Sequence, residues 1–352
     1  MRVEDLDTPV LIVDLDGLED NLDRYHRYFT QHKIGLRPHI KTHKTLAIAH
    51  QQMRRGAIGI TCQKLGEAEV MVAGGVDQDV LIPYNIVGAA KLDRLVTLSR
   101  RTRLTVAADS AYTVEGLSAA AHRTSATVGV VVELDVGGRA GVGTARQAAD
   151  LAALIAGSPG LELRGVMAMP TPTSVRPLIQ ETLALFDRAG LPHPVVSGGS
   201  TGCAFQAHEI PELTEFRAGE YPVGGVSHLQ RGTHTVAQCS LRVLMTVVSR
   251  PTADRAILDG GSKALSGATT EWEGGPCMGY IVEYPRARLY GASEEHGHVD
   301  VSACDPRPRL GERVQVLPVH PCPCVNEHDE MAAVRRGTVE AIWPVHARGR
   351  MR

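Results

Sequence analysis

From residue 9 to about residue 225, short aliphatic runs alternate with longer, Ala-rich amphipathic stretches. This alternation is typical of βα units around a parallel sheet, because neighbouring parallel strands need a crossover helix. Eight candidate strands over about 200 residues predict a (β/α)8 TIM-like barrel, with an open doubly wound sheet as the alternative. No strand precedes a GxGxxG turn, which disfavours a dinucleotide site. The predicted strands are Val10–Val13, Lys33–Leu36, Ala57–Thr61, Val80–Ile82, Leu104–Ala107, Gly129–Leu134, Arg164–Met167 and Pro194–Ser197.

After about residue 236 the pattern changes to apolar runs separated by Gly, Pro and charged turns, with no convincing helix. Such spacing predicts a small antiparallel β domain. We therefore expect a barrel over residues 9–235 and a β domain over residues 236–352, to which residues 1–8 are added. The strands predicted for the β domain are Leu241–Val248, Ala256–Leu258, Tyr280–Tyr284, Arg313–Leu317, Met331–Val334 and Val339–Trp343.

Charge and composition exclude several classes of protein. The net charge of -2 provides no basic excess for phosphate contacts, so we expect no nucleic-acid partner. No apolar run approaches the roughly 18–20 residues of a membrane span, and the acidic N-terminus lacks the apolar core of a signal peptide. We therefore expect a cytoplasmic protein. Seven cysteines, an odd and scattered set, predict free thiols and no disulfide framework.

The segment from Pro38 to Lys44 places two lysines and two histidines where an early strand ends. A lysine that leaves solvent at such a position favours its neutral amine, which can attack a carbonyl and form a Schiff base. Lys41 is the candidate for this role. The alternative is a hydrated basic loop, since charge clusters are usually solvated.

The segment Ser197–Gly202 follows the last predicted barrel strand and reads Ser-Gly-Gly-Ser-Thr-Gly. Its glycines allow the backbone to approach a ligand, and its hydroxyl groups add hydrogen-bond donors. Phosphate sites of (β/α)8 barrels recur after the seventh and eighth strands. The segment therefore predicts a phosphate-binding loop, with a turn that binds no ligand as the alternative.

A third candidate site is His-Pro-Cys-Pro-Cys at residues 320–324. We expect the alternating prolines to exclude a helix and keep the backbone extended. His320, Cys322 and Cys324 would then share a face, where an imidazole and a thiolate suit Zn²⁺ or a similar divalent metal. The alternative is a rigid strand end with incidental thiols.

Ten motifs carry a resemblance to a known family: RPHIKTHK, CQKLGEAEV, LIPYNIVG, ELDVGGRAGVG, SGGSTG, RAGEY, LDGGSKALS, EEHG, HPCPCVN and WPVHARGR. In this order, over about residues 5–349, they resemble the D-threonine aldolase and D-serine dehydratase family. The resemblance implies the alanine racemase-like fold, pyridoxal 5'-phosphate (PLP), a divalent metal such as Zn²⁺ or Mn²⁺, and a homodimer.

Carried onto this chain, the resemblance implies that Lys41 bears the cofactor as a Schiff base and that Arg139 faces the pyridine nitrogen. His320 and Cys322 would bind the metal. We predict that His43, two residues after Lys41, is an acid/base. The phosphate would be held by Ser197, Gly198, Gly199, Ser200, Thr201 and Gly202, with Tyr221 nearby.

The expected activity is metal-assisted retro-aldol cleavage of a D-3-hydroxy amino acid to glycine and an aldehyde. A D-serine dehydratase giving pyruvate and ammonia is an alternative that Cys322 favours. A PLP-binding protein without lyase activity is a further alternative. It is favoured by two segments, residues 167–172 and 222–228, that depart from the family pattern.

Overall fold

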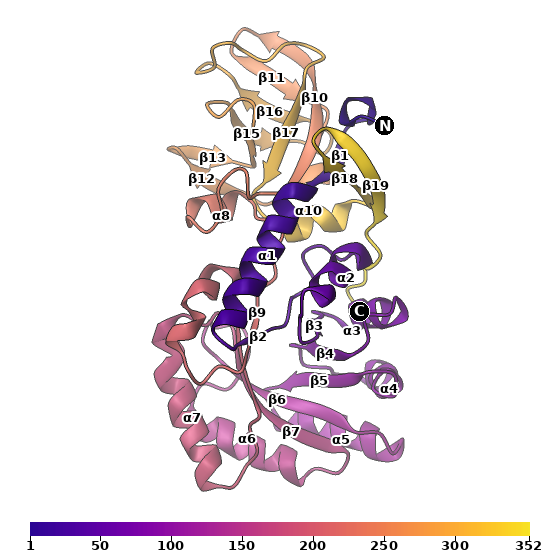
Figure 1. Ribbon diagram of the computed structural model, residues 1–352, viewed down its shortest axis with the longest axis vertical. Helices are drawn as coiled ribbons and strands as arrows, with labels where there is room; N and C mark the ends of the chain where they lie inside the picture. The colour runs from indigo at the N-terminus through magenta and orange to yellow at the C-terminus, as the bar shows by residue number, and fades with distance from the viewer. The chain divides into compact units, whose positions relative to one another are not determined.

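The computed structural model describes residues 1–352, which form two compact units (Figure 1). The barrel unit comprises Tyr25–Lys41, Leu46–Gly219 and Gly349–Arg352. The β unit comprises Met1–Arg24, Thr42–Thr45 and Glu220–Arg348. Helix α1 (Leu15–Gln31) begins in the β unit and ends in the barrel unit. No helix combines the length and the apolar character that a membrane span requires.

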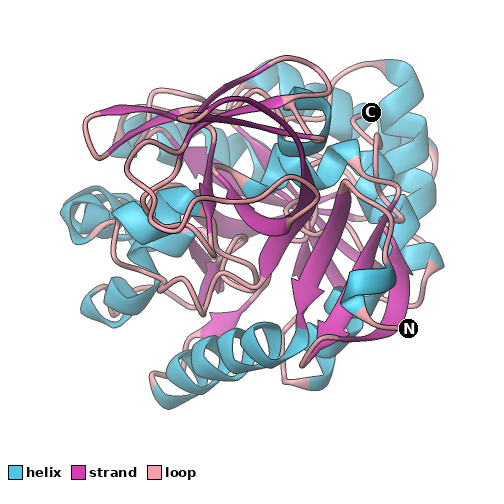
Figure 2. Ribbon diagram, turned by 90° about the horizontal axis from the view of Figure 1, so that it is seen from above, coloured by secondary structure: helices cyan, strands magenta, loops and turns pink.

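Eight parallel strands form the sheet of the barrel unit, in the order β2-β9-β8-β7-β6-β5-β4-β3. The sheet closes where His39 pairs with Thr61, whose N–H donates to the Pro38 carbonyl at 2.8 Å. The predicted TIM-like barrel is thereby confirmed, and its helices lie outside its strands (Figure 2). The strands are β2 (Gly35–Leu36), β3 (Ile60–Thr61), β4 (Asp79–Ile82), β5 (Arg103–Ala108), β6 (Val128–Leu134), β7 (Leu161–Ala168), β8 (Val195–Gly199) and β9 (Glu215–Arg217).

The barrel helices begin at positions that the sequence caps. The Ser110 hydroxyl accepts the Thr113 N–H at the start of α5, and the Thr144 hydroxyl accepts the Gln147 N–H at the start of α6. Such caps satisfy N–H groups that have no acceptor within the helix. The helices are α2 (Leu46–Arg54), α3 (Leu65–Ala73), α4 (Ala89–Leu98), α5 (Ala111–Arg123), α6 (Ala145–Gly157) and α7 (Arg176–Arg188), with 3₁₀ segments η2 (Thr173–Val175) and η3 (Thr201–Glu209).

The barrel core is built mainly from aliphatic residues. All seven residues of β6 are buried, as expected for a parallel strand that is covered on both faces. Leu81, Ala107, Val131 and Met167, from the four consecutive strands β4 to β7, pack into one cluster. This rigid scaffold fixes where each strand ends, and the ends carry the candidate site.

The β unit is built on a nine-stranded sheet in which β10 also pairs with β11. That second pairing closes β10, β11, β16, β15, β14 and β17 into an antiparallel barrel of six strands. The strands are β1 (Val10–Asp14), β10 (Leu241–Thr252), β11 (Arg255–Leu258), β14 (Gly279–Ile281), β15 (Arg288–Ala292), β16 (Gly297–Asp300), β17 (Arg313–Pro318), β18 (Glu330–Arg335) and β19 (Thr338–Pro344), with a separate hairpin of β12 (Thr270–Trp272) and β13 (Gly275–Cys277). Its short helices are η1 (Val3–Asp5), α8 (Val226–Gln230), α9 (Ser262–Leu265) and α10 (Pro321–Glu327).

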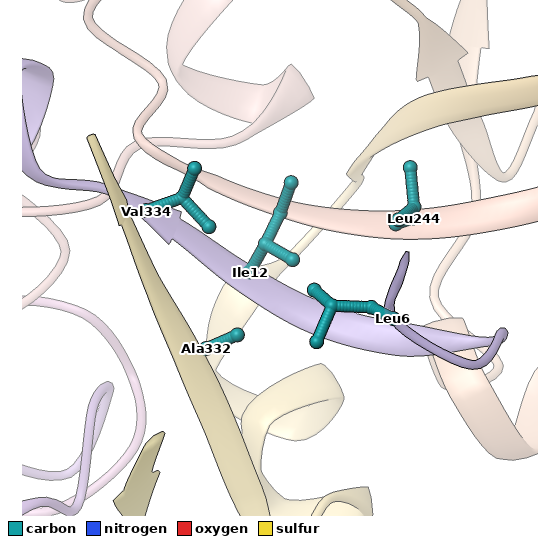
Figure 3. Packing of buried hydrophobic residues seen from close by; sticks show 5 residues of the cluster. All are labelled: Leu6, Ile12, Leu244, Ala332 and Val334. Atoms are coloured by element: carbon teal, nitrogen blue, oxygen red, sulfur yellow. The ribbon is translucent and has the colours of Figure 1, made fainter. Parts of the chain in front are cut away.

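Strand β1 belongs to this sheet, so the prediction that residues 10–13 open the barrel was wrong. It pairs antiparallel with β10 and parallel with β18. Ile12 of β1 packs with Leu6, Leu244, Ala332 and Val334 (Figure 3). An apolar run alone does not say which sheet a strand joins, and here the partners lie more than 200 residues away in sequence.

The place of β1 in the barrel count is taken by β9, which the sequence did not predict. Its residues Glu215 and Arg217 are charged but buried. The predicted domain boundaries therefore differ from the observed units, because residues 9–24 and 220–235 belong to the β unit.

Candidate functional site

Lys41 ends the first segment of the barrel unit, two residues after the bridge that closes the barrel. Strand β2 leads into it, and the Ile40 N–H donates to the Thr61 carbonyl at 2.9 Å. Its side chain is partly buried. The structure thus places the predicted Schiff-base lysine at the carboxyl ends of the barrel strands, where TIM-barrel enzymes carry their active sites.

The residue beside Lys41 that sequence reasoning overlooked is His39. Its side chain is 6 % exposed, its Nδ1 accepts the Lys41 backbone N–H at 3.4 Å, and its Nε2 lies 3.1 Å from Gln63 Oε1. Burial, and then the charge of Lys41, lower the pKa of His39 well below its usual value. His39 is therefore a neutral imidazole with its proton on Nε2, and the amide nitrogen of Gln63 is left for other partners.

Below these residues lies a buried network of charged groups. Arg37 donates to both carboxylate oxygens of Glu215 at 2.8–3.0 Å, and the Ser197 hydroxyl donates to the same carboxylate at 2.8 Å. Arg217 donates to the Ser197 hydroxyl and to the Ala168 carbonyl, both at 2.8 Å. Burial lowers the pKa of Arg217 to about 10, so it remains a cation at neutral pH.

The first half of the predicted phosphate loop makes hydrogen bonds and packing contacts with other residues of the barrel. The Ser197 hydroxyl belongs to the buried network, Gly198 packs against Phe216, and the Gly199 N–H donates to the Thr171 hydroxyl at 3.0 Å. Thr171 lies in segment 167–172, so this segment holds the first half of the phosphate loop in place through a hydrogen bond. The Ser200 N–H donates to the Arg217 carbonyl at 3.3 Å, where the loop leaves the strand.

The second half of that loop begins the 3₁₀ segment η3. Ser200 has a positive φ of 104°, which turns the chain from β8 into η3. The Thr201 hydroxyl accepts the Gly219 N–H at 3.3 Å, and Gly202 is exposed. The first N–H groups of such a segment lack acceptors within it and suit an anion.

Arg139 lies in the loop after β6 and is half exposed, with its Nη2 3.7 Å from Glu133 Oε1. Burial raises the pKa of Glu133, against the opposing effects of Arg139 and Arg217. Both side chains line a cavity of about 590 Å³, together with Gln63, Tyr84 and Asp109. The cavity opens among the carboxyl ends of β3 to β6, so Arg139 is placed where a bound ligand could meet it.

The β unit holds a separate cluster made of Glu220, His320 and Cys322. Their ligand atoms all lie within 4.8 Å of one another. Glu220 Oε1 lies 3.3 Å from His320 Nε2 and 3.7 Å from Cys322 Sγ. A carboxylate, an imidazole and a thiol that converge in this way form a donor set for a divalent metal.

Neighbouring side chains hold this cluster in place. His228, 1% exposed, lies with Nε2 2.7 Å from Glu220 Oε2 and Nδ1 2.9 Å from the Thr233 hydroxyl. The Thr42 hydroxyl lies 3.1 Å from Cys322 Sγ. Burial raises the pKa of Glu220, but hydrogen bonds from His228 and His320 outweigh it and hold the pKa well below the usual range. Hydrogen bonds to Cys322 and Glu220 raise the pKa of His320 to about 10.

The extended backbone predicted for residues 320–324 was wrong, because α10 starts at Pro321. Pro321 and Pro323 occupy the first turn of a helix, where the missing N–H groups would have had no acceptor. Helical geometry separates the two thiols. Cys322 joins the cluster, whereas Cys324 is fully buried with its Sγ 3.2 Å from the Ala264 carbonyl. Cys324 is therefore not part of the cluster of Glu220, His320 and Cys322.

The remaining predicted residues lie in the β unit. His43 is fully buried, and its Nδ1 accepts the Thr45 N–H at 3.3 Å. Lys44 Nζ donates to Asn326 of α10 at 2.9 Å, so this lysine ties the segment to the helix that carries Cys322. Tyr221 is buried, and its carbonyl lies 3.1 Å from His234 Nε2.

Sequence reasoning missed Glu220 and His228 as candidates. Glu220 stands inside the RAGEY motif, beside the Tyr221 that was selected, and His228 ends the divergent segment 222–228. An acid beside a motif tyrosine was the available signal for Glu220. His228 offered none, because a single histidine in a glycine-rich segment has no distinctive spacing.

Comparisons with known proteins show the fold and the family. The model of the alanine racemase N-terminal domain matches residues 13–226, and a serine dehydratase domain model matches residues 240–334. A D-threonine aldolase of Arthrobacter sp. is 34% identical over 98% of this chain and 93% of its own length. A D-threo-3-hydroxyaspartate dehydratase of a Delftia species is 30% identical over 90% of this chain and 91% of its own length.

A crystal structure of D-threonine aldolase from Filomicrobium marinum has a TM-score of 0.88 and 33% identity, covering 99% of this chain and 97% of that one. An alanine racemase of Clostridium difficile, at 12% identity and a TM-score of 0.70, shares the fold. The chain therefore belongs to the family of D-threonine aldolases and D-3-hydroxyaspartate aldolases and dehydratases, which are PLP-dependent lyases.

Proposed function

We propose that this lyase cleaves D-3-hydroxy amino acids by a retro-aldol reaction, with PLP on Lys41 and a divalent metal on His320 and Cys322. The observation that carries the proposal is the chain order at the strand end. Lys41 is followed directly by Thr42, whose hydroxyl lies 3.1 Å from Cys322 Sγ. Consecutive Cα atoms are about 3.8 Å apart. Along the chain, the contacts of the metal cluster thus begin at the residue directly after the candidate cofactor lysine.

The barrel residues fit PLP by their chemistry. A primary amine and the first turn of η3, in which Gly202 is exposed, lie at the carboxyl ends of the barrel strands, which suits a phosphorylated aldehyde. We infer that Lys41 attaches the cofactor, that Ser200, Thr201 and Gly202 hold its phosphate, and that Arg139 faces its ring nitrogen. When bound, PLP withdraws electrons from the Cα of an attached amino acid.

The protein's own groups would then decide which bond at Cα breaks. Retro-aldol cleavage needs the proton of the β-hydroxyl to leave, and a metal held by His320 and Cys322 would act as a Lewis acid on that oxygen. His43 remains the predicted acid/base. Because its Nδ1 accepts an N–H, any proton that His43 moves is carried by Nε2.

A dehydratase is the second candidate function, and the donor type of Cys322 favours it. In that reaction Lys41 takes the Cα proton and the β-hydroxyl leaves, which gives a keto acid and ammonia. Both activities occur among the named relatives of this chain.

The test is a panel of D-3-hydroxy amino acids with product identification, run with and without Zn²⁺ and Mn²⁺. The proposal expects D-threonine to give glycine and acetaldehyde, and D-3-hydroxyaspartate to give glycine and glyoxylate. Formation of 2-oxobutyrate or oxaloacetate together with ammonia would show that the protein is a dehydratase and not an aldolase.

A further inference from the structure

We propose that Glu220 is a third protein ligand, which together with His320 and Cys322 makes a tetrahedral, zinc-type site with one open position. The inference deepens the proposed function, because it names the metal class and the coordination of the site that acts there. The family resemblance implied His320 and Cys322 as ligands and did not include Glu220. The third one comes from a segment a hundred residues upstream of the other two.

The separations between the donor atoms carry the proposal. Zinc bonds of about 2.0–2.2 Å to nitrogen and oxygen and about 2.3 Å to sulfur, at tetrahedral angles, give N···O of about 3.4 Å and S···O of about 3.6 Å. The right angles of an octahedral ion would give about 2.9 Å and 3.1 Å with the same bonds. Glu220 Oε1 lies 3.3 Å from His320 Nε2 and 3.7 Å from Cys322 Sγ. Both distances from Glu220 Oε1 therefore match the tetrahedral values more closely than the octahedral ones.

The kinds of donor point to the same metal. Thiolate and imidazole ligands favour zinc over magnesium or manganese, which prefer oxygen. Glu220 and Cys322 can both bind as anions, so their charges would balance one divalent cation. The side chain of His320 is 47% exposed, which leaves the cluster accessible to a small ligand. Three protein ligands and one open position are typical of catalytic zinc sites.

The second carboxylate oxygen of Glu220 is already engaged, which fixes how this residue could bind. Oε2 lies 2.7 Å from Nε2 of the buried His228, whose Nδ1 lies 2.9 Å from the Thr233 hydroxyl. With Oε2 bonded to His228, Glu220 would bind the metal through Oε1 alone, as a monodentate ligand. On the other side, the Thr42 hydroxyl orients Cys322 Sγ at 3.1 Å. Outer partners of this kind fix the orientation of metal ligands.

The alternative is an ion pair without metal, in which His320 as a cation simply bonds to Glu220 and Cys322. The two arrangements make opposite predictions for a metal titration. We would measure Zn²⁺ affinity of the full-length, PLP-loaded protein by competition with a chromophoric chelator, without substrate. Glu220→Gln should weaken Zn²⁺ binding by about 100-fold or more, above the 10–100-fold typical of losing an outer partner.

Cobalt substitution reports the coordination directly. The Co²⁺-loaded wild type should show the intense visible bands of a tetrahedral ion and a thiolate charge-transfer band. Glu220→Gln should lose intensity in the visible bands. His228→Phe should keep the tetrahedral spectrum and weaken Zn²⁺ binding by about tenfold, because it removes an outer partner only. Circular dichroism would establish that each variant is folded.

Glu283→Gln is the matched control, since Glu283 lies in the same unit and accepts the Gln315 N–H at 2.9 Å outside the cluster. It should bind Zn²⁺ as the wild type does. Unchanged Zn²⁺ affinity in folded Glu220→Gln, or weak octahedral Co²⁺ bands in the wild type, would overturn the inference. Because no substrate enters these measurements, their failure is distinct from a failure to cleave D-threonine.

Discussion

Two groups of polar and charged side chains, one in each unit, differ in how their polar atoms are arranged. In the barrel unit Arg37, Glu215, Ser197 and Arg217 bond to one another and to a carbonyl, so the network is closed. In the β unit, by contrast, a carboxylate oxygen of Glu220, a ring nitrogen of His320 and Sγ of Cys322 lie within 4.8 Å of one another.

This difference indicates that the network in the barrel unit is structural and that the cluster in the β unit is a binding site. A closed network of buried charges satisfies its own members and holds strand ends in register, but it offers a ligand nothing. A group of donors that converge, with outer partners already engaged, is arranged for something that binds between them. The comparison predicts that substitutions in the closed network act on stability and that substitutions in the converging group act on metal binding.

The largest effect is expected at Lys41, which lies two residues after the bridge that closes the barrel. Lys41→Ala should lower kcat by on the order of 10³-fold or more, since it removes the amine that attaches the cofactor. The visible absorbance of bound cofactor should disappear, as measured on the purified protein after incubation with PLP. Retention of that absorbance and of turnover would show that another lysine attaches PLP.

Glu215→Gln should cost about 3–5 kcal/mol of unfolding free energy, because the buried Arg37 and Arg217 lose the carboxylate charge that offsets theirs. Arg37 then keeps only Asp79 as an anionic partner. Arg37 and Glu215 are 6% and 4% exposed, so solvent cannot compensate. Urea denaturation would measure the change. The control is Asp150→Asn, which breaks an exposed pair with Arg146 and should cost less than about 1 kcal/mol. Equal effects of the two substitutions would contradict a structural role for the network.

His234 should make the stability of the β unit depend on pH. Burial lowers the pKa of His234 to about 4, so the unfolded chain binds the proton first as pH falls. The free energy of unfolding is unaffected by the titration of His234 above a pH of about 6.5. It falls by up to about 3 kcal/mol as the pH falls from there towards 4. Urea denaturation at several pH values should show a shallower loss for His234→Gln than for the wild type. Parallel curves would assign the pH dependence to other groups.

The smallest effect concerns the thiols of α10. Burial raises the pKa of Cys324, whereas Cys322 is partly exposed beside the other ligands. In metal-free protein, an alkylating reagent should modify Cys322 well before Cys324, as followed by peptide mass spectrometry. Zn²⁺ should protect Cys322. Equal modification of both thiols would contradict their separation by the helix.

Aliphatic runs predicted most of the fold but not its charged parts. Strands such as β6 could be located because burial on both faces requires continuous apolar residues. Strand β9 could not, since Glu215 and Arg217 read as surface residues until the fold shows that Arg37 pairs with Glu215 and that the Ser197 hydroxyl accepts a hydrogen bond from Arg217. Its absence from the prediction also explains why β1 was placed in the barrel.

The candidate site was predicted where a motif stands alone and missed where it needs the fold. Lys41, His320 and Cys322 stand in compact motifs, and the structure places each at a site that could use it. Glu220 meets Cys322 only after the chain has folded, across about a hundred residues of sequence. Helix α10 was missed because prolines were read as helix breakers, although the first turn of a helix accepts them.

The most direct test of the account is removal of metal from the PLP-loaded enzyme by dialysis against EDTA, with D-threonine cleavage measured before and after. The account predicts that the cofactor absorbance stays while formation of glycine and acetaldehyde stops, and that Zn²⁺ restores it. Undiminished cleavage by metal-free protein would contradict the claim that the Glu220, His320 and Cys322 cluster takes part in the reaction.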